Sequence, residues 1–109
     1  MTRLSRKLEL ESLSRTGDGA GGFTGNWISL GTHWGAVEQG RGRIEGGDGY
    51  VRTRGSYRIT IRAVPPTSPS RPEAGQRFRE GTRVFLIRAV ADAKDARHLI
   101  CYVDEETAT

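Results

Sequence analysis

The stretch "SYRITIRAV", residues 56–64, constrains the fold most, because apolar and polar side chains alternate along it with a period of two. Such a pattern predicts a β-strand with one buried and one solvent-facing side. The side expected in the core carries Tyr57, Ile59, Ile61 and Ala63. Residues 40–55 before it hold six glycines, and residues 64–75 after it form a proline-rich loop with all four prolines of the chain. A helix therefore cannot extend through this part of the sequence.

Two segments before this strand also favour extended structure. In "LSRKLELESL", Leu8 and Leu10 lie on one side of a strand, and Lys7, Glu9 and Glu11 lie on the other. An amphipathic helix is the competing interpretation. "RTGDGAGGFTGN" then predicts a long turn, and "WISLGTHWGAVEQ" predicts a bent or bulged strand from Trp27 to about Glu38, because Gly31 and Gly35 interrupt it.

The C-terminal third predicts two further strands, "RVFLIRAVA" and "HLICYVDE", joined by the turn "DAKDAR". In the second of them, Leu99, Cys101 and Val103 share one face, while Ile100 and Tyr102 share the other. Five or so strands with glycine or proline loops make the chain all-β. We expect one domain, residues 1–109, folded as a small, partly closed β-barrel with long glycine/proline-rich loops.

The residue types do not favour catalysis. Cys101 is the single cysteine, so an intrachain disulfide is excluded and a zinc site would depend on His33 and His98. His98 and Cys101 lie three residues apart, which sends their side chains to opposite faces of a strand. No G-x-S-x-G motif occurs, and "GRGRIEGGDG" lacks the lysine of a phosphate-binding loop. We therefore expect no enzyme activity, no metal, no cofactor and no membrane span.

The charge of the chain is unevenly distributed. The net charge is +4, and all of the 17 basic residues except Lys7 and Lys94 are arginines. Residues 40–55 are predicted to form a loop or hairpin, whose glycine-rich centre is flanked by Arg41, Arg43, Arg52 and Arg54. Three interpretations of this segment stay open: a solvated loop, contact with nucleic-acid phosphates, and contact with a neighbouring subunit.

The order of several short motifs resembles a known family. "GDGAGGFTGNWISLGTHWGAVEQG", then "YRITIRAV", then "GQRFREGTRVFLIRAVADAKDARHLICYVDEE" resemble the phage head-tail joining proteins, also called head-closure or stopper proteins. The most informative features are Asp18 and the Gly21-Gly22 pair ahead of Trp27. The sequence departs from the family pattern at Gly35, which follows the tryptophan of "HWGAVE" where the family has alanine.

The resemblance implies a non-enzymatic structural protein of a tailed phage, prophage or gene transfer agent. Such a protein is a subunit of a homo-oligomeric ring that lies at the head-tail joint of the virion and is cytoplasmic before assembly. The implied partners are portal or adaptor proteins on the head side, tail terminator or tail tube proteins on the tail side, and packaged double-stranded DNA without sequence specificity. It further implies that residues 40–55 project into the DNA channel and that Asp104, Glu105 and Glu106 are candidates for docking to a neighbouring protein.

Two alternatives remain at this stage. A small barrel with basic loops is also typical of monomeric proteins that bind single-stranded nucleic acid, although Tyr50 is the one aromatic residue in the basic stretch. A tail-side ring protein of similar β architecture is the other.

Overall fold

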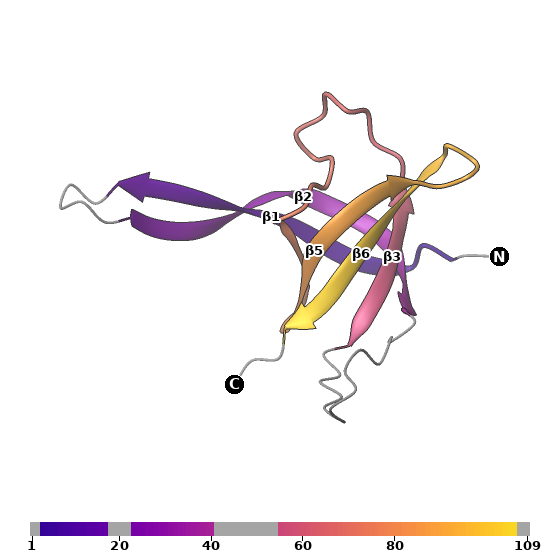
Figure 1. The fold of residues 1–109 in the computed structure, drawn as a ribbon, viewed down its shortest axis with the longest axis horizontal. Coiled ribbons are helices and arrows are strands. Elements are labelled where there is room, and N and C mark those ends of the chain that lie inside the picture. The colour runs from indigo at the N-terminus through magenta and orange to yellow at the C-terminus, as the bar shows by residue number, and fades with distance from the viewer. Residues whose placement is uncertain (1–2, 18–22, 41–54, 107–109) are drawn as a thin grey trace, which may run out of the picture.

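The protein is described here by a computed structural model, which covers residues 3–17, 23–40 and 55–106. These residues form a six-stranded antiparallel sheet (Figure 1). Its strands are β1 (Arg6–Gly17), β2 (Phe23–Gln39), β3 (Ser56–Arg62), β4 (Arg77–Glu80), β5 (Arg83–Asp92) and β6 (His98–Glu106). Within this part of the chain, no helix is long and apolar enough to cross a membrane.

The sheet closes on itself in the order β1-β2-β3-β6-β5-β4. The all-β prediction is confirmed, and the barrel is closed where the sequence predicted partial closure. Closure depends on β4, a strand that the sequence did not predict, which pairs with β1 through Glu9↔Arg79, Leu10↔Phe78 and Glu11↔Arg77. The barrel is uneven, because β4 has 4 residues and β2 has 17.

The first two strands are longer than predicted. The N-terminal segment is a strand and not a helix, and it continues to Gly17. Strand β2 begins at Phe23, so much of the predicted turn is extended backbone. The predicted bulge is confirmed: the register shifts between Leu10 and Glu11, and Gly31 opposite has a φ of 130°, which favours glycine.

The outer parts of β1 and β2 form a two-stranded arm that extends away from the barrel (Figure 1). We define the arm as residues 12–17 of β1 and 23–28 of β2. These residues pair only with each other in the described sheet, because β4 contacts β1 no further than Glu11 and β3 contacts β2 from Gly35 onward. The sequence did not predict this arm.

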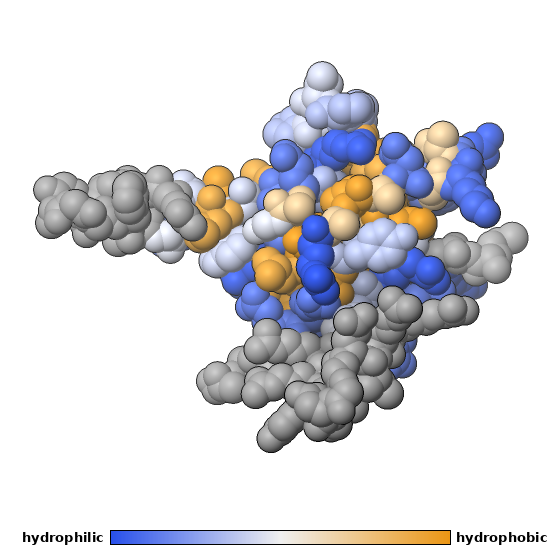
Figure 2. All heavy atoms as spheres, viewed as in Figure 1, coloured by the Kyte–Doolittle hydropathy of each residue, from blue (hydrophilic) through white to orange (hydrophobic). Residues whose placement is uncertain are grey.

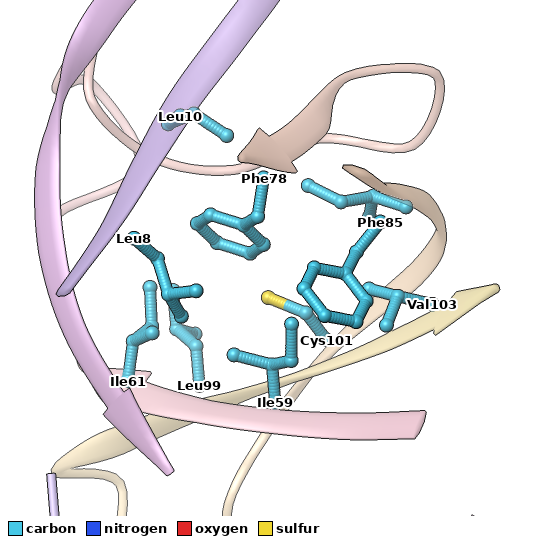
Figure 3. Close-up of a cluster of buried hydrophobic side chains, with 10 residues drawn as sticks. Leu8, Leu10, Ile59, Ile61, Phe78, Phe85, Leu99, Cys101 and Val103 are labelled. Carbon is cyan, nitrogen blue, oxygen red and sulfur yellow. The ribbon is translucent and has the colours of Figure 1, made fainter. Parts of the chain in front are cut away.

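Ten buried side chains fill the barrel (Figure 3). They come from five strands and are Leu8, Leu10, Ile59, Ile61, Phe78, Phe85, Ile87, Leu99, Cys101 and Val103. The alternation predicted for β3 and β6 is confirmed at Ile59, Ile61 and the three inward positions of β6. Burying this apolar surface is the main stabilising contribution to the fold.

One predicted orientation is wrong. Ala63 lies beyond the end of β3 and is exposed, so it takes no part in the core. Glu11 lies on the side of β1 opposite Leu10, as predicted, because Leu10 pairs with the buried Phe78 and Glu11 pairs with Arg77. It is nevertheless only 5% exposed, and an ion pair with Arg77 compensates for burial of the carboxylate.

Candidate functional site

One end of the barrel carries the two attachment points of the 40–55 segment and the acidic end of β6. The backbone N–H of Gly40 donates to Ser56 O at 2.8 Å, and the N–H of Glu105 donates to Gly55 O at 2.9 Å. Both ends of the 40–55 segment are therefore fixed beside the end of β6. Its four candidate residues, Arg41, Arg43, Arg52 and Arg54, lie outside the described residues.

The acidic end of β6 lies next to these attachment points, and two of its three carboxylates have partners within the barrel. Asp104 accepts a hydrogen bond from Ser56 Oγ at 3.0 Å and pairs with Arg88 at 3.2 Å. Glu105 accepts two hydrogen bonds from Arg83, at 2.8 and 3.0 Å. Glu106 is exposed. The structure thus brings the predicted docking residues together and leaves Glu106 turned to solvent.

Glu105 belongs to a chain of alternating charges that runs around this end of the barrel. Arg6 of β1 donates from Nε to Glu80 of β4 at 2.8 Å, and Arg83 links Glu80 to Glu105. The hydrogen bond from Arg83 lowers the pKa of Glu105, and the one from Arg6 lowers the pKa of Glu80. These contacts connect the strands at the closing seam of the barrel to β6.

A depression of about 790 Å³ lies on the outer face at the same end. Its walls include Tyr57 and Arg58 of β3, Tyr102 of β6 and Arg88 of β5. The register of β5 against β6 shifts between Ile87 and Ala89, so Arg88 is the extra residue of a bulge and points outward. This surface offers two guanidinium groups beside an exposed aromatic ring, a combination suited to binding and not to acid-base chemistry.

The arm is fixed to the barrel by charged side chains at its base. Arg77 of β4 donates from Nε to Glu11 of β1 at 2.7 Å, and its guanidinium carbon lies 4.0 Å from the ring centroid of Trp27 on β2. Arg79 approaches the other oxygen of Glu11 at 3.5 Å. An isolated two-stranded ribbon is marginally stable. We infer that Arg77 holds the arm at a defined angle to the barrel.

The nucleophile and acid-base candidates do not form a catalytic site. Cys101 is buried in the core, where desolvation raises the pKa of its thiol to about 12. His98 lies on the opposite face of β6, as predicted, with Nδ1 2.9 Å from Asp95. His33 is buried, packs edge-on against Phe78, and places Nε2 2.7 Å from Ser70 O. Burial lowers the pKa of His33, so the neutral ring donates to that carbonyl and links β2 to the proline-rich loop.

Within residues 3–17, 23–40 and 55–106, no group of three His, Cys, Asp or Glu side chains has a geometry suited to holding a metal ion. Together these features define a class: a small closed antiparallel barrel that carries charged and aromatic side chains at one end and an arm at its side.

Comparison with known proteins gives the family. Residues 1–107 match the family described as phage head completion protein. A chain described as part of the virion of a native gene transfer agent particle is 37% identical, with a TM-score of 0.78 over 99% of this chain and 100% of that one. Protein SF1141 from Shigella flexneri 2a is 20% identical, with a TM-score of 0.74 over 100% of this chain and 98% of that one, and shares the fold. No curated protein matches the sequence.

The chain belongs to the phage head completion protein family. The predicted resemblance is therefore confirmed at the level of the family, together with its non-enzymatic, structural character.

Proposed function

We propose that this protein is a head-closure ring subunit, which joins the DNA-filled head of a phage or gene transfer agent particle to its tail and helps to retain the packaged DNA. Membership of the head completion family supports a place in the virion. The likeness to a chain of a gene transfer agent virion, over the full length of both chains, supports the same kind of particle. The proposed neighbours are portal or adaptor proteins on the head side and tail terminator or tail tube proteins on the tail side.

The observation that carries the proposal is the fixed point from which the basic segment leaves the barrel. Gly40 and Gly55 are each held by a backbone hydrogen bond to the β3 and β6 end. The four arginines of residues 41–54 therefore start from one end of every subunit. Repeated around a ring, they would place a positive collar at the DNA channel. Such a collar binds phosphates without reading bases, and its affinity falls as salt rises.

We propose that the acidic end of β6 contributes to docking mainly through Glu106. Asp104 and Glu105 already pair with Arg88 and Arg83, so reversing their charge would also destabilise the barrel. Glu106→Lys is the sharper test, because this side chain is exposed. We expect Glu106→Lys to reduce the yield of tailed particles without changing the melting temperature of the purified protein. Unchanged particle yield would remove Glu106 from the docking surface.

The experiment that tests the proposed function is electron microscopy of particles from a producing strain that lacks the gene, with a plasmid-borne wild-type copy as the control. We expect heads separated from tails, with the packaged DNA lost or accessible to nuclease, and restoration by the plasmid. Intact, tailed, DNA-filled particles in the absence of the protein would contradict the proposal.

A further inference from the structure

An exposed tryptophan lies on the outer face of the barrel, away from Gly40, Gly55 and the acidic end of β6. Trp34 of β2 is 55% exposed, while its neighbours His33 and Gly35 face inward and are buried. Among the side chains whose exposure the structure describes, Trp34 is the most exposed of the large apolar ones. Tryptophan is enriched at protein interfaces, because its large apolar ring gains much from being covered.

Two cations flank this ring across the sheet. Lys7 of β1 is the direct partner of Trp34, and Arg62 of β3 follows Ile61, the partner of Gly35. Arg62 and Trp34 line one depression together with Leu4 and Thr32. We refer to Lys7, Trp34 and Arg62 as the tryptophan row.

Within the described part of the chain, no carboxylate neutralises the charges of the row. Seven arginines of the described residues pair with carboxylates, namely Arg6, Arg58, Arg71, Arg77, Arg79, Arg83 and Arg88. Among the described side chains, no carboxylate lies within ion-pair distance of Lys7 or Arg62. Both side chains are exposed. The row therefore attracts an anionic occupant.

We propose that the tryptophan row is a docking site for an acidic segment of another virion protein, which seats an apolar side chain against Trp34 and places carboxylates near Lys7 and Arg62. Tryptophan and arginine are enriched at the residues that dominate protein interfaces, and flanking charges of one sign select a partner of the other. The proposal rests on the proposed function, because it requires a place in the particle.

The chemistry of the row favours a protein over nucleic acid. Double-stranded DNA offers phosphates to Lys7 and Arg62 but keeps its bases stacked, so the ring of Trp34 would gain no partner. Proteins that bind single strands use several aromatic platforms in succession. The row provides one.

The test is the amount of this protein in purified particles when variants replace the wild type in the producing strain, measured by quantitative mass spectrometry against the portal protein. Each variant is first checked for a normal far-ultraviolet spectrum and melting temperature. We expect Trp34→Ala and the pair Lys7→Glu with Arg62→Glu to lower incorporation at least tenfold, as loss of a dominant interface residue does. We expect Trp34→Phe to keep most of it.

Lys94→Glu is the control for charge reversal, because it makes the same charge change as Lys7→Glu alone, on the exposed β5–β6 turn outside the row. It should leave incorporation unchanged. Wild-type amounts of folded Trp34→Ala in the particles would overturn the proposal. Binding of a fluorescent oligothymidylate by the wild type, lost in Trp34→Ala while incorporation stays normal, would assign the row to nucleic acid instead. Absence of the wild-type protein from purified particles would contradict the proposed function itself. This outcome differs from a failure of the docking proposal, in which the wild type and Trp34→Ala are both incorporated.

Discussion

The buried carboxylate at the base of the arm makes the most stringent test of the fold. Glu11 is 5% exposed and lies 2.7 Å from Arg77 Nε, while the side chain of Arg77 is itself 18% exposed. In Glu11→Gln the shape is retained but the charge is lost, which leaves the guanidinium largely buried without its anion. Breaking a buried ion pair from one side costs roughly 3–5 kcal/mol.

We expect a cost at or just below the lower end of that range for Glu11→Gln, about 2–3 kcal/mol, because Arg77 keeps some contact with water and still stacks on Trp27. The contact with Arg79 adds little, since that side chain is 46% exposed. For a domain of this size, the change corresponds to a fall in melting temperature of about 8–12 °C. Thermal unfolding followed by circular dichroism and urea unfolding measure it independently.

The matched control is Glu9→Gln, two residues earlier on the same strand. Glu9 faces Arg79 across the sheet but forms no ion pair within 4 Å among the described residues, so we expect a change below about 1 kcal/mol. Equal, small effects of Glu9→Gln and Glu11→Gln would refute the reasoning, because they would mean that the ion pair does not support the arm.

Three further predictions concern the core and its pH dependence. Gly35→Ala would place a Cβ 2.9 Å from Leu8 Cδ1 and 3.1 Å from Thr60 O. We expect the free energy of unfolding, measured with urea, to fall by about 1–3 kcal/mol. An unchanged urea midpoint would argue against such close packing. Burial raises the pKa of the Cys101 thiol to about 12 from the 9.0 of an exposed thiol, so this thiol should lower stability as pH rises from 9 to 12. Cys101→Ala should remove this contribution and flatten the slope in that range. Burial lowers the pKa of His33 from 6.5, so as pH falls this histidine becomes protonated in the unfolded chain before it does in the folded protein. The free energy of unfolding should therefore fall as pH drops below about 6.5. A His33→Gln variant whose stability depends on pH in the same way as the wild type's would contradict this.

The sequence predicted the strands whose side chains alternate cleanly. In β3 and β6 every second residue is apolar, and each inward position from Leu99 to Val103 is buried as expected. Strand β4 escaped notice because Phe78 is its single apolar residue, and three charged residues surround it. The dipeptide Gly81-Thr82 between β4 and β5 could have indicated this hairpin from the sequence, because two-residue hairpin turns favour glycine. In the structure Gly81 has the positive φ that such turns require.

The sequence predicted the proposed contact surfaces less well, because they depend on which residues pair across neighbouring strands. A period of two places Glu11 on the side opposite Leu10, and no local pattern indicates that Arg77 and Arg79 of β4 will pair with it there and leave it buried. The pairing of Asp104 with Arg88 depends on a second bulge, which no local pattern indicates. The alignment of Lys7, Trp34 and Arg62 depends on the register of three strands. Composition alone did locate the basic segment and the acidic end, and the structure holds Gly40 and Gly55, which flank the basic segment, at the same end of the barrel as the acidic end of β6.

A three-dimensional reconstruction of the head-tail joint in purified particles would test the central claim most directly. Our account predicts a ring at the joint into which this barrel fits, with the end that carries Gly40 and Gly55 facing the DNA channel. Particles in which the barrel fits no density at the joint, or fits a ring with that end turned away from the channel, would contradict it.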